Sequence, residues 1–89
     1  LVPLAARRRR QRTEFAGIML TIHLLQHEGT PEADVESREA HLHHHLRWTP
    51  EFARRVVRHA ARQELIQRDD GSLALTAQGR TTARTALGE

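Results

Sequence analysis

Apolar residues recur at helical spacing from about Arg8 to Glu28, and Gly29 follows as a residue that commonly ends a helix. One stripe of this helix carries five large apolar side chains, and we predict that it faces the core: Phe15, Ile18, Met19, Ile22 and Leu25. Leu20 and Leu24 fall nearly opposite this stripe. A helix that is apolar on two sides is usually packed on both. The second side is therefore expected to face a partner subunit or the rest of a larger protein.

Two further helices are predicted downstream, joined by a tight connection over Arg47–Thr49. The spacing of Val35, Leu42 and Leu46 predicts a weaker helix over about 36–46. The next helix has a clearer start, because Thr49 is a good capping residue and Pro50 is favoured in the first helical position. It is expected to end near Gln63 and to bury a stripe made of Phe52, Val56 and Ala60, flanked by Ala53 and Val57.

A hairpin and a last helix complete the pattern. Asp70-Gly71 lies between two short apolar runs, Leu65–Arg68 and Leu73–Leu75, and Asp-Gly in such a place indicates a hairpin turn. Thr76 then caps a helix from Ala77 to about Leu87. The order predicts an α+β, mostly helical fold of the winged helix-turn-helix type, with three helices, a two-stranded wing and a C-terminal helix.

The length and composition of the chain limit the number of domains and the chemistry that it can carry out. Eighty-nine residues suffice for one small domain, and the chain has no Cys, which excludes disulfides and thiol chemistry. The sequence pI is about 11.2 although the formal net charge is only +3. Five of the 14 basic residues lie in residues 1–12, and the remaining residues are slightly acidic. The basic character is therefore local.

The N-terminal basic cluster suggests a division of the chain. We assign residues 1–12 to an Arg-rich arm or membrane-exit segment and residues 13–89 to the winged-helix domain. An apolar start followed by Arg is typical of a membrane helix emerging into the cytoplasm, and a disordered basic arm is the alternative. No stretch approaches the roughly 20 apolar residues that span a bilayer, and a chain that starts at Leu1 is expected to be a fragment or processed product. The candidate lipid-facing residues are Arg7, Arg8, Arg9, Arg10 and Arg12.

The predicted hairpin resembles the wing of bacterial winged-helix regulators of the DtxR-like and MarR-like types. The residues that carry this likeness are Glu64-Leu65-Ile66, Asp69-Asp70-Gly71 and Leu73-Ala74-Leu75-Thr76-Ala77-Gln78-Gly79-Arg80. They match a pattern in which a Leu-Ile pair and a polar turn precede Leu-x-Leu-Thr-x-x-Gly-Arg.

Nearly the whole chain resembles one group, the cytoplasmic C-terminal DtxR-like extension of bacterial ABC transporter permeases for manganese, zinc or iron. The likeness rests on the Arg-rich start and on Phe15-Ala16, Met19-Leu20, His23-Leu24-Leu25, His27-Glu28-Gly29, His41-Leu42 and His45-Leu46-Arg47-Trp48. It implies that a last membrane helix runs into the Arg-rich segment on the cytoplasmic side of the inner membrane. DtxR-type repressors take metal ligands largely from helices beyond the winged helix, and this chain ends at Glu89.

A stripe of arginines on the predicted third helix is the sharpest candidate binding surface. In a helix-turn-helix this helix enters the major groove, where Arg reads guanine or contacts phosphate. The candidate DNA- or anion-binding residues are Thr49, Arg54, Arg55, Arg58, Arg62 and Arg68. The acidic pair Asp69-Asp70 at the wing tip and the absence of Lys weigh against DNA. The same face could instead bind anionic lipid or an acidic patch, such as residues 28–39 of a second copy. It could also be a solvated face without a partner.

Seven histidines suggest a candidate metal site. His23 and His27 are spaced i, i+4 on one helix, and His41 has the same spacing to His45 and also neighbours His44. Glu28 or Glu39 are the carboxylates expected to complete a set of three or four ligands. Zinc or manganese would suit such a site, a pH response is an alternative, and the histidines are otherwise ordinary polar surface or boundary residues. No cofactor is firmly assigned.

Catalysis is not expected, because the chain offers no Cys nucleophile, no Ser elbow and no Gly-rich phosphate loop. The preferred hypothesis is a non-catalytic binding or regulatory domain, the cytosolic C-terminal extension of a metal-ion ABC transporter permease. Its expected partners are other transporter subunits or a second copy through the first helix, and the membrane surface through the Arg-rich arm, with no small-molecule substrate. The alternative is a cytoplasmic DNA-binding transcriptional regulator of the DtxR or MarR type.

Overall fold

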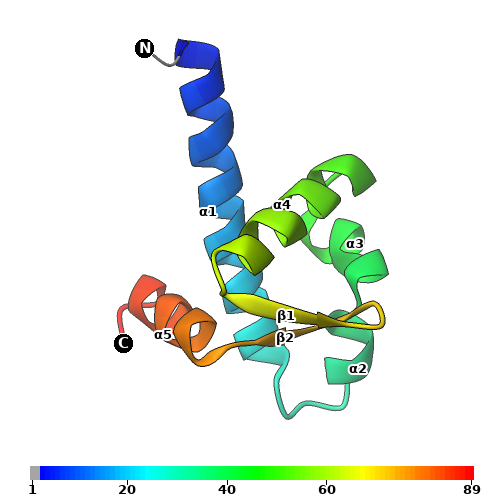
Figure 1. The fold of residues 1–89 in the computed structure, drawn as a ribbon. Helices are drawn as coiled ribbons and strands as arrows, with labels where there is room; N and C mark the ends of the chain where they lie inside the picture. Colours follow the sequence, from blue (N-terminus) through cyan, green and yellow to red (C-terminus); the bar gives the residue numbers. More distant parts are fainter. Residues whose placement is uncertain (1–2) are drawn as a thin grey trace.

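The computed structural model describes residues 3–89, and of His43 the backbone alone. The elements in chain order are α1 (Leu4–His27), α2 (Ala33–Glu36), the 3-10 turn η1 (Glu39–His41), α3 (Leu42–Leu46), α4 (Pro50–Arg62), β1 (Ile66–Asp69), β2 (Ser72–Leu75) and α5 (Ala77–Ala86) (Figure 1). The described part of the chain is mostly helical with one antiparallel pair of strands. The prediction of a mostly helical α+β chain is confirmed.

Helix α1 is longer than the sequence pattern indicates. It begins at Leu4 rather than near Arg8, and it crosses the predicted boundary between residues 12 and 13 without a break. Its N-terminal half projects from the body of the molecule, whereas its C-terminal half lies among the other elements (Figure 1). The helix ends at His27, and Gly29 takes a positive φ of 72° just beyond it, as expected for a helix terminus. The Arg-rich segment is therefore a helical extension.

The predicted core face of α1 is wrong. Phe15 is 63% exposed and Met19 is 38% exposed, whereas Leu20 and Leu24 are buried. The face that was expected to meet a partner thus carries the core. The face that was expected to be buried is exposed at Phe15 and Met19 and half-buried at Ile18, Ile22 and Leu25.

Close approach between helices explains this reversal. Both α4 and α5 contact α1, and the buried side of α1 includes the small residues Ala16 and Gly17. Ala60 of α4 and Ala83 of α5 are also fully buried. Small side chains bring the helix backbones together and let Leu20 fill the space between them, so hydrophobicity alone misjudges the face.

The predicted helix over 36–46 is also wrong, because the chain breaks it into α2, η1 and α3. Arg38 is extended and forms an isolated antiparallel bridge with Ser72 of β2. The Leu73 amide donates to the Ser37 carbonyl at 2.8 Å, and the Glu39 amide donates to the Gly71 carbonyl at 2.9 Å. This backbone pairing satisfies one edge of the hairpin and forces the helix to restart after it.

Helix α4 and the hairpin agree with the predictions. The Thr49 side chain accepts a hydrogen bond from the Phe52 amide at 3.1 Å, and Pro50 is the first helical residue. The strands pair from Ile66 opposite Leu75 to Asp69 opposite Ser72. Asp70 and Gly71 have φ of 49° and 81°, as a tight two-residue hairpin turn requires.

The core lies between α1, α4 and the hairpin. It consists of Ala16, Leu20, Leu24, Leu42, Ala53, Val56, Val57, Ala60, Ile66 and Leu73, with Leu46, Trp48, Phe52, Ala61, Leu65 and Leu75 packed against it. Within residues 3–89, none of the helices combines the length and the apolar character needed to cross a bilayer.

Candidate functional site

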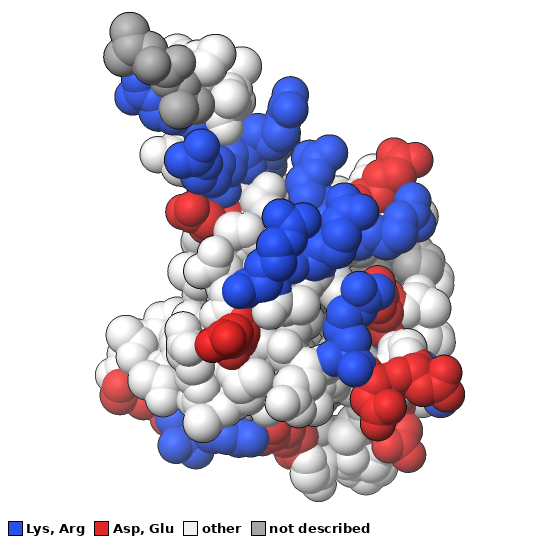
Figure 2. All heavy atoms as spheres, viewed as in Figure 1, with Lys and Arg blue, Asp and Glu red and all other residues white. Residues whose placement is uncertain are grey.

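Helix α4 presents a basic face, which we define as Arg54, Arg55, Arg58 and Arg62. All four side chains are exposed, while the opposite side of the helix is buried in the core. In Figure 2 the basic side chains form a band that continues from α4 onto the projecting half of α1. Acidic side chains gather near the hairpin turn and α2. The basic face and the arm therefore present one continuous positive surface.

Two predicted members of the anion-binding set have partners inside the molecule. The hydroxyl oxygen of Thr49 accepts the Phe52 amide at the start of α4. The guanidinium of Arg68 donates to both carboxylate oxygens of Glu39, at 3.0 and 3.2 Å. Thr49 thus caps α4, and Arg68 joins β1 to Glu39. The exposed arginines that remain lie on α4 and α1.

A hollow of about 390 Å³ separates the projecting half of α1 from the start of α4. Its charged lining residues are Arg12, Arg47 and Arg55, together with Glu51. Trp48 and Phe52 also line it and pack edge to face, with ring centroids 5.6 Å apart. This hollow could not be predicted from the sequence, because Arg12 and Arg55 are 43 positions apart in the chain.

A second candidate site, the histidine cluster, consists of His23, His27, His45 and Glu36. His23 and His27 lie on α1, Glu36 ends α2 and His45 lies on α3. The ring centroids of His23 and His27 are 4.5 Å apart, and His45 lies 5.5 Å from His23 and 5.6 Å from His27. A hollow of about 270 Å³ opens onto these three rings. Three elements thus bring four potential ligands together.

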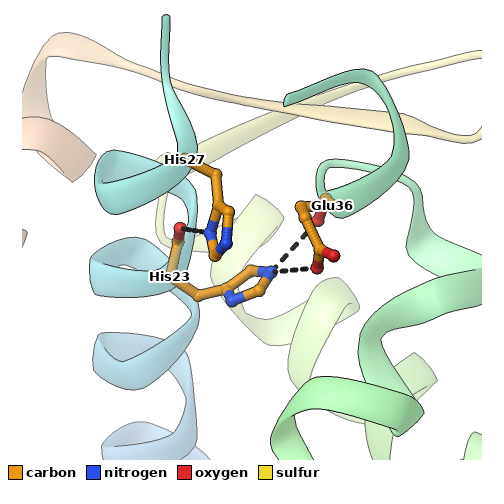
Figure 3. Close-up of side chains that lie close together, drawn as sticks. All are labelled: His23, His27 and Glu36. Carbon is orange, nitrogen blue, oxygen red and sulfur yellow. Dashed lines mark hydrogen bonds and ion pairs between the residues drawn. The ribbon is translucent and has the colours of Figure 1, made fainter. Parts of the chain in front are cut away.

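The carboxylate of Glu36 contacts two of the three histidines of the cluster. One carboxylate oxygen lies 3.6 Å from Nε2 of His23, and the other lies 3.0 Å from Nε2 of His45. Nε2 of His23 also donates to the backbone carbonyl of Glu36 at 3.1 Å (Figure 3). The His27 ring donates from Nδ1 to the His23 carbonyl at 2.9 Å. The same close-up shows the rings of His23 and His27 on the side of α1 that faces Glu36.

Burial controls the charge of His23. Its side chain is 7% exposed, and this desolvation lowers the pKa of His23 below its usual 6.5. The neighbouring rings of His27 and His45 act in the same direction, while the hydrogen bond to the Glu36 backbone and the Glu36 carboxylate oppose it. His23 is therefore a neutral imidazole near neutral pH, which is the state that binds a metal ion.

The structure divides the histidines differently from the sequence analysis. It confirms that His23 and His27 lie together, but it places His45 with them and His41 with His44, whose ring centroids are 6.0 Å apart. His41 ends the 3-10 turn η1, in which side chains three positions apart lie closest, so His41 neighbours His44 rather than His45.

The expected carboxylates also lie elsewhere. Glu28 pairs with Arg80 of α5, which accounts for the lowered pKa of Glu28, and Glu39 pairs with Arg68. Glu36 takes the central place instead. No sequence pattern pointed to Glu36, because its position depends on the turn that follows α2.

Comparison with known proteins gives one clear similarity. The chain is 41% identical over 70 residues to the zinc transport system membrane protein TroD of Treponema pallidum (strain Nichols). The match covers 79% of this chain and 19% of TroD, so the chain spans about a fifth of the length of that protein. No family model matches the chain, and no solved structure gives a significant match. The chain is thus related to one part of a metal-transport membrane protein.

Proposed function

We propose that this chain is a non-catalytic regulatory domain of a metal-ion ABC transporter permease, attached as a winged-helix extension on the cytoplasmic side of the membrane. The similarity to TroD over most of the chain carries this proposal. A match to a fifth of a membrane protein, in a chain whose described helices do not span a bilayer, is what an extramembrane portion would give.

The architecture supports the winged-helix part of the proposal. Helices α3 and α4 follow one another through the short Arg47–Thr49 connection, and the β1–β2 hairpin and α5 come next. The bridge between Arg38 and Ser72 adds a third, very short strand-like contact to the hairpin. This element order is the one expected for a winged helix-turn-helix.

The projecting half of α1 supports attachment to a membrane protein. It is helical from Leu4 onward and carries Arg7, Arg8, Arg9, Arg10 and Arg12 without an acidic residue before Glu14. Positive residues beside a membrane helix favour the cytoplasmic side and are attracted to anionic lipid. A helix that leaves the bilayer and continues into α1 would transmit movement between the two parts.

The exposed side of α1 suits contact with other transporter subunits or a second copy. Phe15 and Met19 are both exposed, and Ile18 and Ile22 are half-buried beside them. Exposed large apolar side chains on one stripe are typical of an interaction surface. The basic face of α4 offers a further contact for lipid head groups or acidic protein surface.

DNA binding is the weaker hypothesis. The similarity to TroD does not favour it, and the acidic pair Asp69-Asp70 occupies the hairpin turn that would approach phosphates.

The sequence upstream of Leu1 in the gene tests the attachment directly. We expect the reading frame to continue into several apolar spans of about 20 residues each. A reading frame that starts at or near Leu1 would refute the permease assignment.

Uptake of radioactive zinc tests the regulatory role. The permease would be compared with a form that stops before Thr13, at equal abundance in membrane fractions. We expect the shortened form to transport zinc but to lose the dependence of its rate on intracellular zinc. A full-length variant with Arg54 and Arg58 replaced by Glu gives a second test that keeps the domain. Unchanged rate and zinc dependence in both forms would contradict a regulatory role.

A further inference from the structure

We propose that His23, His27 and Glu36 form a binding site for one Zn²⁺ ion, with His45 holding the carboxylate in place. One ligand atom from each of the three residues lies within 4.8 Å of the other two. The site joins α1 to α2, so a bound ion would hold α2 against the C-terminal half of α1. Metal binding is a property of this chain alone and does not depend on the permease role.

The distances suit a small ion after a modest closure. Tetrahedral zinc with bonds of the usual length places its ligand atoms about 3.3 Å apart. Nε2 of His23 and the nearer Glu36 oxygen are already 3.6 Å apart. The three ligand atoms now lie within 4.8 Å of one another, and the His27 and Glu36 side chains must rotate slightly to bring them to the separation that zinc requires. Both side chains are only partly buried, so they have room to do so. The backbone can therefore stay in place.

The hydrogen bond of His27 selects its ligand atom. Nδ1 of His27 donates its proton to the His23 carbonyl at 2.9 Å, so the lone pair of a neutral ring is on Nε2. Histidine ligands of zinc commonly donate their second nitrogen to a backbone carbonyl or a carboxylate in this way. On His23 the ion would replace the hydrogen bond from Nε2 to the Glu36 carbonyl, and the single proton of that neutral ring would move to Nδ1.

Glu36 supplies an oxygen that lacks a hydrogen bond. Its Oε2 is buried and has no hydrogen-bond partner within the described residues, although it lies close to His23. An unpaired buried carboxylate oxygen destabilises the fold, and a cation beside it removes that cost. Its Oε1 is held by Nε2 of His45 at 3.0 Å. His45 thus orients the carboxylate while Oε2 faces the two other ligands.

The donor set favours zinc over the hard cations. Two imidazole nitrogens and one carboxylate oxygen suit Zn²⁺, whereas Mg²⁺ and Ca²⁺ prefer oxygen ligands throughout. Three protein ligands leave a fourth position for water, and His23 and His27 line a hollow of about 270 Å³ beside this site. An accessible three-ligand site exchanges its ion more readily than a closed four-ligand site, as a sensor of free zinc requires.

Zinc titration of the 89-residue chain against a chromophoric chelator tests the site. We expect one ion per chain, no competition by Mg²⁺, and a rise in Tm when zinc is added. His45→Ala, which removes the partner that orients Glu36, should weaken zinc binding about tenfold. His27→Ala and Glu36→Gln, which remove ligands, should each weaken it more. His41→Ala is the matched control, because it removes a histidine outside the site, and it should change affinity by less than about twofold.

Circular dichroism with chelator present checks that each variant folds. NMR of the wild-type chain gives a readout that needs no variant, since zinc should shift the Nε2 resonance of His27 and leave Nδ1 protonated. Absence of stoichiometric binding, or a loss in His41→Ala as large as that in His27→Ala, would overturn the proposal. Because the permease is absent from these measurements, their failure leaves the proposed transporter role standing, and failure of that role leaves the zinc site standing.

Discussion

The backbone of Gly79 packs so closely on Leu65 that a Cβ added to the glycine would lie 1.9 Å from the Leu65 carbonyl oxygen. The same oxygen accepts a hydrogen bond from the Thr76 amide at 3.1 Å, which fixes its position. The contact joins the first turn of α5 to the segment between α4 and β1. The glycine of the Leu-Thr-x-x-Gly-Arg pattern is therefore required by packing.

Replacement of Gly79 by Ala is expected to destabilise the fold by about 3 kcal/mol, the upper part of the usual range for overpacking. The added methyl group meets backbone atoms of Leu65, which cannot rotate away as a side chain would. Urea unfolding followed by circular dichroism measures the change. A loss smaller than about 1 kcal/mol would show that α5 moves freely on the hairpin.

Gly17 provides the matched control. It lies inside α1, and an added Cβ would be 3.8 Å from Cδ2 of His59, an ordinary contact distance. Gly17→Ala should therefore stabilise the chain by about 0.5 to 1 kcal/mol, because alanine loses less backbone entropy in a helix. The same unfolding measurement applies, and opposite signs for the two glycines are the expected result.

Loss of the Thr76 hydroxyl should cost about 1 to 2 kcal/mol, the upper part of the range for a helix cap. This oxygen accepts the Gly79 amide at 2.9 Å, and its proton goes to the Glu64 carbonyl at 2.5 Å. Thr76→Ala removes both bonds, whereas Thr81→Ala changes an exposed position of the same helix. Equal effects of the two substitutions on the free energy of unfolding would contradict the capping role.

The orientation of α1 can be tested by comparing its two faces. Leu20→Ala should cost about 3 kcal/mol because Leu20 is fully buried. Phe15→Ala should cost less than about 0.5 kcal/mol because Phe15 is 63% exposed. Chemical denaturation of the isolated chain distinguishes them. A larger loss for Phe15 would restore the face that the sequence pattern indicates.

Sequence signals predicted the structure correctly where a residue type is favoured by one particular backbone conformation, such as a helix cap or a tight turn. Thr49 and Pro50 placed the start of α4, and Asp70-Gly71 placed the hairpin turn. Gly29 marked the end of α1. Each depends on contacts within a few residues, so no knowledge of the tertiary structure was needed.

Signals that depend on distant contacts were misjudged. The bridge between Arg38 and Ser72 joins positions 34 apart, and it interrupts the helix that the spacing of Val35, Leu42 and Leu46 predicts. Glu36 lies just before this bridge, and its carboxylate contacts His23 of α1 and His45 of α3. The pair of His23 and His27 could be predicted from helical spacing, whereas the carboxylate between them and His45 could not.

Acid should destabilise the folded chain through His23. Burial holds the pKa of His23 below 6.5 in the folded state, so the unfolded chain binds the proton first as the pH falls. The contribution of His23 to stability is therefore complete above about pH 6.5 and decreases below it, toward the lower pKa of the folded state. The groups that face it are His27 on α1, Glu36 on α2 and His45 on α3.

His23→Gln isolates this effect. Glutamine keeps an N–H donor for the Glu36 carbonyl but does not titrate, so the variant should lose less stability than the wild type between about pH 7.5 and about pH 5.5. Urea unfolding at several pH values, with a chelator present to remove metal ions, measures both slopes. The His41→Ala variant should keep the wild-type slope, because His41 lies outside the cluster. Parallel curves for His23→Gln and the wild type would mean that the buried imidazole is protonated as easily in the folded chain as in the unfolded one.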